Sequence, residues 1–507
     1  MSIPADKQSL NSLTQNSKDA MAELEGVFPA MMKMREHLTA IENEAANIDG
    51  SILALFSKTE DLYIGSHFII HELMSSLRLL LDTDIVYEKQ YHVQNINLTL
   101  CEAYKYFVGV KKDGVWPLLK PMISALDNHI LQSYKTIIDV ELTKLGAEYC
   151  DKQMRNSTAH YDEPIKRYNQ LLKITDEDKY CKATSQFMLI YLRISQISTI
   201  IFAIISQIMP KSTAQNIEQK MPMFDVKAFV ENNIAEKLSS DERIRKLSKE
   251  SLTNRNNNID SLYNDYLKYE NTKKFILTRN LQIPQSIEIL CQLVLLRMMT
   301  SFVRCDITCA MRAYINSKSS VERSLHLRKI YMSEVSALTH LYGYNQDKKR
   351  KSLWHQLINI DTTYDEKELS PLRENFEELT AHLNRTRRNL YTHFRENDNL
   401  NVLKRYNAYR ELNQVAEINE ALKLLHLCEK IDNYTMSVLK RIGEEIEQKS
   451  KEQKNSRYAM FENMRTMTRY SRSSETMKAQ TLTMLNEMEK GSPRKAVELS
   501  INIFESK

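Results

Sequence analysis

Apolar residues recur along this chain at the three- and four-residue spacing that places them on one face of an α-helix. The pattern predicts helices separated by short polar turns, and no run of alternating apolar and polar residues predicts a strand. We therefore expect an all-α fold. The helices predicted in the first half cover 68–81, 98–110, 118–145 and 187–209, and those in the second half cover 289–303, 321–342, 353–360, 372–383 and 416–442.

Changes in polarity divide the chain into five parts. Two apolar helical domains are separated by a polar stretch that includes the asparagine-rich segment Asn254–Asn258, and that stretch still shows helical spacing. We expect an N-terminal helical segment at 1–61, a first helical domain at 62–209, a helical connector at 210–285, a second helical domain at 286–443 and a basic Met/Lys/Glu-rich helical tail at 444–507.

The two helical domains share an internal repeat. The only two tryptophans of the protein, Trp116 and Trp354, fall at equivalent places in it. Corresponding landmarks lie between 233 and 238 positions apart, so small insertions suffice to align them. The sequence therefore predicts a duplicated helical domain. The other matched landmarks are 88–93 with 322–327, Gly109 with Gly343, and 166–169 with 404–407.

The composition agrees with helices joined by short turns, because only 9 glycines and 10 prolines occur among 507 residues. The formal net charge of +5 is compatible with a polyanionic partner without requiring one, so local clusters of charge matter more than the total. The 7 cysteines form no CxxC pair and no Cys/His zinc spacing. We expect reduced cysteines in a cytoplasmic protein, with neither a metal site nor a cofactor.

One apolar segment, 187–209, is long enough to cross a bilayer. Arg193, Gln196 and Gln207 lie within it, and a charged side chain at that depth is costly in lipid. We therefore expect a helix buried in the core of the first domain, and no membrane association. The first residues, 1–7, lack the basic start and apolar block of a signal peptide.

The strongest chemical signal is an arginine followed directly by an asparagine and, five positions after the arginine, by a histidine. This pattern occurs at 155–160 (RNSTAH) and at 388–393 (RNLYTH), which are equivalent places in the repeat. Histidine titrates near neutral pH and can move a proton, while arginine binds phosphate through a fixed fork of donors. On a helix, each asparagine shares a face with the histidine four positions later.

This pattern, duplicated in an all-helical chain, resembles the motif of the HEPN ribonucleases. In that family two domains pair, and their motifs meet at the interface to form one composite site. The resemblance covers 62–209 and 286–443 and implies an intramolecular pseudo-dimer that cleaves RNA without metal. It implies that the ribose 2′-hydroxyl attacks the adjacent phosphate, with histidine as general acid or base and arginine stabilising the added charge. The residues that it assigns to the catalytic site are Arg155, Asn156, His160, Arg388, Asn389 and His393.

Other basic residues extend the predicted contact with RNA. We expect the two motifs to face each other across a cleft lined by Arg385, Arg387 and Arg395. The matched KRYN tetrapeptides at 166–169 and 404–407 have two interpretations that the sequence leaves open. They are phosphate contacts with a stacking tyrosine, or repeat residues that pack their tyrosines into the core. In the first interpretation the RNA contacts come from Lys166, Arg167, Lys404 and Arg405.

The function implied by the resemblance is a metal-independent RNA endonuclease, in the class of bacterial toxins and antiphage defence effectors. Tandem domains on one chain are also similar to RNA-guided CRISPR effectors, so a guide RNA, an antitoxin RNA and an inhibitory protein join the RNA substrate as candidate partners. The alternative function is a non-catalytic helical protein that binds RNA or acts as a scaffold. The expected oligomeric state is a monomer with an internal pseudo-dimer, and a homodimer that pairs like motifs is the alternative.

Overall fold

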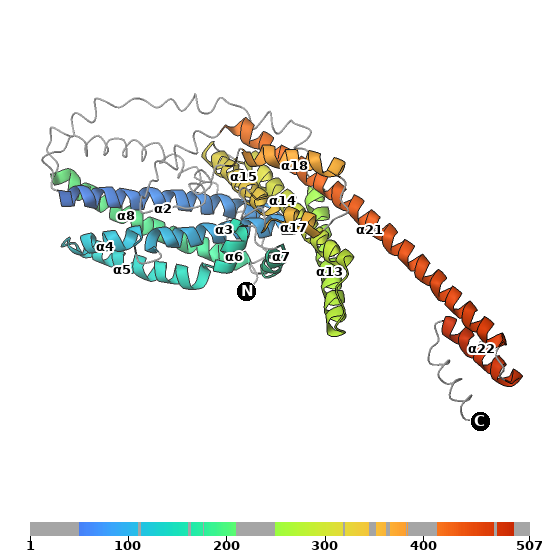
Figure 1. Ribbon diagram of the computed structural model, residues 1–507. Coiled ribbons are helices and arrows are strands. Elements are labelled where there is room, and N and C mark those ends of the chain that lie inside the picture. The colour runs from blue at the N-terminus through green and yellow to red at the C-terminus, as the bar shows by residue number, and fades with distance from the viewer. Residues whose placement is uncertain are drawn as a thin grey trace. The chain divides into compact units, whose positions relative to one another are not determined.

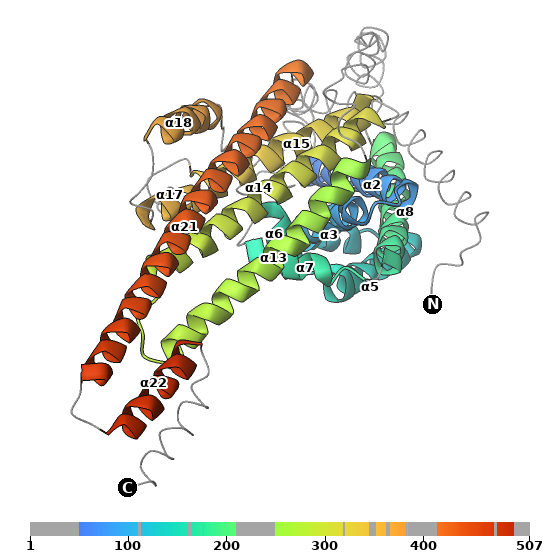
Figure 2. The ribbon, with the colours of Figure 1, turned by 90° about the vertical axis from the view of Figure 1, so that its right-hand side faces the viewer.

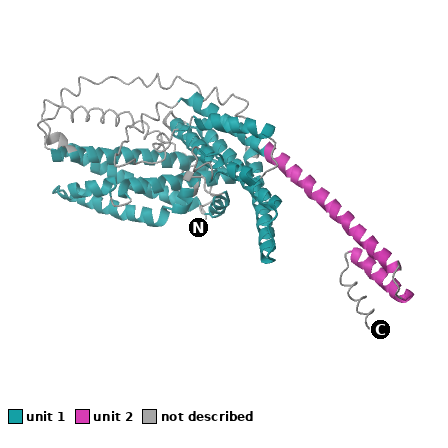
Figure 3. Cartoon of the chain, viewed as in Figure 1, with its two compact units in different colours: residues 1–432 teal, residues 433–507 magenta. Residues whose placement is uncertain are grey.

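A computed structural model describes most of the chain, and all the regular elements among its described residues are helices. The predicted all-α class is confirmed. The chain divides into two compact units, Met1–Asp432 and Asn433–Lys507 (Figure 3). The described residues are 50–109, 113–160, 164–175, 177–208, 249–317, 320–343, 351–360, 366–381, 383, 413–470 and 474–490.

The first helices of unit 1 pack around the long helix α2 (Figure 1). Helix α2 lies against α3 and α8, and α8 also packs against α5. Between Thr59 and Leu80, apolar and polar residues of α2 alike are buried around the whole circumference, so the polar groups there need internal partners. The elements are α2 (Gly50–Asp82), α3 (Val86–Val108), α4 (Val115–Ser124), α5 (His129–Lys144), the short π-helix η1 (Leu145–Tyr149), α6 (Lys152–His160), α7 (Pro164–Leu172) and α8 (Glu177–Ile208).

The single helix predicted at 118–145 is two helices, α4 and α5. Asn128 causes the break, because its side chain accepts hydrogen bonds from the backbone N–H groups of Ile130 and Leu131 and caps the N-terminus of α5. The expected domain boundary at 61–62 falls inside α2, so no break in the chain's helical structure separates an N-terminal segment there.

The later helices of unit 1 pack against α14, which lies between α13 and α15 (Figure 2). Part of the expected connector therefore belongs to this group, since α13 lies along α14 and buries Leu252, Ile259 and Leu262. Arg304 of α14 pairs with Asp432 of α21 at 2.6 Å. The elements are α13 (Lys249–Thr278), α14 (Gln285–Ile315), α15 (Ser320–Leu341), α17 (Leu353–Ile360), α18 (Glu366–Ala381) and the first part of α21 (Gln414–Tyr470).

Two of the landmarks aligned in the sequence have similar surroundings in the two groups. Helices α3 and α15 end at Gly109 and Gly343, which have φ angles of 79° and 83°, the left-handed region that only glycine adopts without strain. A buried tryptophan then begins the next short helix in each group. Trp116 donates to Asp139 of α5 at 2.8 Å, and Trp354 packs on Phe376 of α18 with ring centroids 5.4 Å apart.

Among the ion pairs that join these groups, two are related in a reciprocal way, one of them buried and the other partly buried. Arg78 of α2 pairs with Glu322 of α15, and these side chains are 2% and 1% exposed. Arg312 of α14 pairs with Glu88 of α3 at 3.0 Å. Arg78 precedes Glu88 by ten residues, and Arg312 precedes Glu322 by ten. Arg78 of the first group therefore binds Glu322 of the second, and Arg312 of the second group binds Glu88 of the first.

The apolar segment expected in the core lies in α8, and one face of that helix is buried. Phe187, Ile190 and Ile194 are inside, whereas Leu189 and Leu192 are about half exposed. By length and composition alone, two of the described helices could cross a membrane: α8 over Glu177–Ile204 and α14. The last position of the segment, 209, lies outside the described residues.

Unit 2 contains the rest of α21 and the helix α22 (Glu475–Glu489). The two helices are joined by Arg465, which donates to Asn486 Oδ1 at 2.7 Å and pairs with Glu489. Phe461 and Leu485 are buried between them. The expected boundary at 443–444 falls inside α21, so the tail does not begin at a break in the helix.

We predict that the Arg78–Glu322 pair contributes strongly to the coupling of the two groups. Arg78→Met leaves Glu322 buried without its guanidinium, and we expect the free energy of unfolding to fall by about 3–5 kcal/mol in urea denaturation. The added change Glu322→Gln removes the stranded charge and should recover part of that loss.

The matched control is Arg373→Met, which breaks the exposed pair of Arg373 with Glu366. These side chains are 44% and 58% exposed, so the cost should stay below about 1 kcal/mol. Equal losses of unfolding free energy in Arg78→Met and Arg373→Met would contradict the role assigned to the Arg78–Glu322 pair.

Candidate functional site

The first motif lies on α6, and its helix begins in a well-defined way. Asp151 caps α6 by accepting hydrogen bonds from the N–H groups of Gln153 and Met154, each at 2.9 Å. Asn97 of α3 in turn bonds both the backbone N–H and the backbone C=O of Asp151, at 3.0 and 2.9 Å. The start of the motif helix is therefore fixed to α3.

Arg155 of the motif is held by a carboxylate that the sequence did not point to. Its Nε and Nη2 atoms donate to Glu102 Oε1 at 2.9 and 2.6 Å, and its Nη1 donates to Asn156 Oδ1 at 2.9 Å. The Arg155 side chain is 12% exposed, while Glu102 is only 4% exposed. The guanidinium is thus oriented before any ligand arrives, and part of its charge is compensated.

The remaining predicted catalytic residues are less fully placed. His160 ends α6, and its side chain lies outside the described residues. Asn156 is exposed. The expected cleft with the two motifs facing each other therefore stays a prediction. The predicted residues that lie outside the described part of the chain are Arg385, Arg387, Arg388, Asn389, His393, Arg395, Lys404 and Arg405.

Two of the four residues of the first KRYN tetrapeptide, Arg167 and Tyr168, are buried. Arg167 is 1% exposed, pairs with Asp306 of α14 and lies 5.3 Å from the centroid of the Phe302 ring. The contact of Arg167 with RNA stays a prediction, because its guanidinium is already engaged inside the protein. Tyr168 is buried and donates to Asp260 at 2.8 Å, in agreement with the core-packing interpretation for that tyrosine. Lys166 is exposed.

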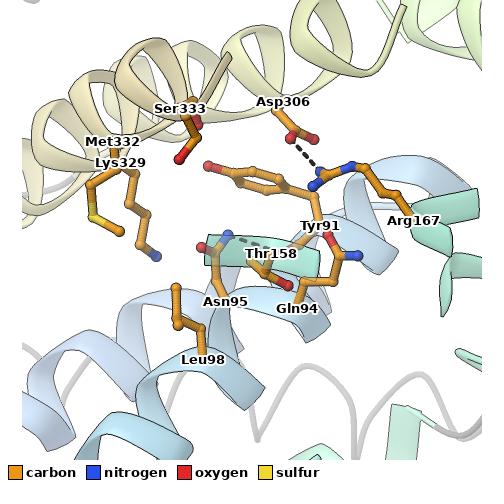
Figure 4. A pocket seen from close by; sticks show the side chains of 11 residues that line it. Tyr91, Gln94, Asn95, Leu98, Thr158, Arg167, Asp306, Lys329, Met332 and Ser333 are labelled. Carbon is orange, nitrogen blue, oxygen red and sulfur yellow. Dashed lines mark hydrogen bonds and ion pairs between the residues drawn. The ribbon is translucent and has the colours of Figure 1, made fainter. Parts of the chain in front are cut away.

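Helix α6 contacts α3 and α7 of its own group and α15 of the other group. A cavity lies among these helices and α14, which we call the junction pocket (Figure 4). Its empty space is about 390 Å³, including the part open to solvent. Thr158 of the motif helix belongs to its wall. The residues that line the pocket are Tyr91, Gln94, Asn95, Leu98, Thr158, Arg167, Asp306, Lys329, Met332, Ser333 and Ser336.

Lys329 is the most unusual ionisable group of the junction pocket. It is buried, and its Nζ donates to Ser76 Oγ of α2 at 2.9 Å. Burial, with the positive charge of Arg328 beside it, lowers the pKa of Lys329 to about 7. The nearby carboxylate of Glu322 opposes this shift without overcoming it. From the sequence alone, Lys329 is one more lysine on an amphipathic helix.

Comparison of the chain with family models, with curated proteins and with solved structures finds no match. Among the described residues, no group of three or more His, Cys, Asp or Glu side chains is arranged to hold a metal ion.

We predict that the stability difference between the wild type and Lys329→Met depends on pH. The folded pKa of about 7 lies below the ordinary value of 10.5, so the unfolded chain binds one more proton between these values. The cost of burying the ammonium is full below pH 7 and disappears as the pH rises towards 10.5. Lys329→Met should therefore be favoured by a few kcal/mol near pH 7, and this advantage should shrink by about 1.4 kcal/mol per pH unit above it.

Urea denaturation at pH 7, 8.5 and 10 measures this difference. The exposed lysine Lys274 of α13 provides the control variant Lys274→Met, for the loss of a lysine without the loss of a buried charge. If the unfolding free energies of Lys329→Met and the wild type differ by the same amount at all three pH values, the amine of Lys329 is not buried as described.

Proposed function

We propose that the protein is a metal-independent RNA endonuclease with one composite site, made from two R-N-x-x-x-H motifs on halves related by duplication. The single observation that carries this proposal is the recurrence of the motif at equivalent places of the repeat, at 155–160 and 388–393. By the resemblance to HEPN ribonucleases, the proposed context is a bacterial toxin or defence effector that acts in the cytoplasm, with or without a guide RNA.

The reciprocal ion pairs support a two-fold relation between the halves. In an isologous interface, residue i of one part contacts residue j of the other, and the reverse contact is also made. Arg78 with Glu322 and Arg312 with Glu88 follow this rule. At the level of helices, α2 contacts α15 and α14 contacts α3.

The position of α6 supports a shared site. Because α6 contacts both α3 and α15, a two-fold relation would bring the second motif to the same pair of helices from the other side. Both motifs would then lie at one junction, close enough to act on one phosphate. The connector makes such an encounter intramolecular.

The chemistry proposed for this site is the attack of the ribose 2′-hydroxyl on the adjacent phosphate. One histidine takes the 2′-hydroxyl proton and the other protonates the leaving 5′-oxygen. Arg155, oriented by Glu102, stabilises the added negative charge on the phosphate oxygens. The products are a 2′,3′-cyclic phosphate and a 5′-hydroxyl. DNA lacks the attacking group and should resist cleavage.

The proposed mechanism predicts cleavage of RNA in excess EDTA. The purified chain is incubated with an end-labelled RNA, and the products are separated by size. The 3′ ends should resist ligation until the cyclic phosphate is opened. Activity that disappears in EDTA and returns with magnesium would exclude this mechanism.

A composite site also predicts strongly non-additive histidine variants. His160→Ala or His393→Ala alone should lower the cleavage rate by about 100-fold or more, since general acid–base catalysis contributes at least that much. The double variant should be only slightly slower than either single variant. The exposed His426 of α21 gives the control His426→Ala, which should retain the wild-type rate. Two independent sites would instead leave about half of the activity in each single variant.

A non-catalytic RNA-binding or scaffold protein is the second candidate. It is favoured by the contact of Arg155 with Glu102, because a guanidinium already compensated by a carboxylate stabilises less of the negative charge that develops during cleavage. Binding of a short RNA without any cleavage, unaffected by either histidine change, would support this function over the endonuclease.

A further inference from the structure

The junction pocket contains a buried hydrogen-bond donor that the fold leaves unused. Gln94 is 1% exposed, and among the described residues no group accepts a hydrogen bond from its Nε2 atom. Burying an amide donor in this way is unfavourable, and such groups are rare in native proteins unless a ligand or water completes them. Gln94 lines the junction pocket, so a ligand there can reach it.

The charges of the pocket favour an anion. Lys329 and Arg167 line it with one carboxylate, Asp306. That carboxylate is already engaged, because it pairs with Arg167 and accepts a hydrogen bond from Tyr87 at 2.8 Å. Lys329 therefore contributes the uncompensated charge of the wall. An ammonium has three donors, and the described contacts of Lys329 use one of them, towards Ser76.

We propose that the junction pocket is a binding site for a phosphate group, held by Lys329, Gln94 and the hydroxyl of Ser333. These donors come from both sides of the pocket, since Gln94 lies on α3 while Lys329 and Ser333 lie on α15 (Figure 4). A phosphate group offers several acceptor oxygens that can meet separate donors, whereas a carboxylate offers two. Part of the empty space of the pocket is open to solvent, and a phosphate group would enter from that side.

The phosphate comes from one of two sources that share this chemistry: the backbone of an RNA strand, or a free phosphate ion. The RNA source rests on the proposed function. It is favoured by Thr158, which lies in the pocket wall and within the first motif, between Arg155 and His160. A backbone phosphate seated in the pocket would place a neighbouring nucleotide beside the motif helix, and the pocket would then position the substrate.

The test is calorimetric titration of the full chain with inorganic phosphate at pH 6.5, in a buffer that contains no other phosphate. The wild type should bind, and Lys329→Met should weaken binding by about tenfold or more, as expected for the loss of a charged hydrogen bond. Gln94→Leu should weaken it less, by about threefold or more. Lys274→Met, at an exposed site, should bind as the wild type does.

Competition with a 2′-O-methyl RNA oligonucleotide, which lacks the attacking hydroxyl and stays intact, separates the two sources. Displacement of phosphate by the oligonucleotide supports the RNA source, and phosphate binding without displacement supports the free ion. No binding by the wild type, or equal binding by wild type and Lys329→Met, overturns the site. Absence of RNA cleavage, by contrast, would overturn the proposed endonuclease function alone. The same titration of the His160→Ala/His393→Ala variant would still test phosphate binding in the pocket.

Discussion

Buried charge sets how the two groups of helices in unit 1 meet. Arg78 and Glu322 are almost completely removed from water, and Arg312 with Glu88 repeats their arrangement. A buried guanidinium or carboxylate without its partner is far more costly than a misplaced apolar side chain. If one group of helices slid along the other, these charged side chains would lose their partners together. The ion pairs therefore fix the relative position of the two groups, which apolar contacts alone would leave variable.

Helix α3 connects the contact between the two groups to the candidate site. It carries Glu88 for the contact between the groups, Asn97 for the start of the motif helix and Glu102 for the motif arginine. The same helix also supplies Gln94 to the junction pocket. Because one rigid helix holds these side chains, a shift at the interface would move the motif arginine and the pocket together. The position of the site is therefore linked to the stability of the interface.

The sequence predicted the parts of this structure that depend on local patterns. Helical periodicity gave the all-α class, because the spacing of apolar residues along one helix is a local property. The helix predicted at 98–110 runs past the end of α3 at Val108, where Gly109 with its φ of 79° follows. The burial of Arg167 and the contact of Glu102 with Arg155 were not predictable. Both depend on residues more than fifty positions away, and no spacing rule links side chains on different helices.

The two halves are not chemically equal around the motifs. In the repeat, Asn95 corresponds to Lys329, and Glu102 corresponds to Ser336. The pocket is thus lined by an amide from one half and an ammonium at the equivalent place in the other. The carboxylate that holds Arg155 likewise has a serine as its counterpart, and a hydroxyl cannot compensate a guanidinium. Arg155 is therefore fixed and partly neutralised, whereas Arg388 has no carboxylate at the position aligned with Glu102. If both arginines act on one phosphate as proposed, they would contribute unequal charge to its binding.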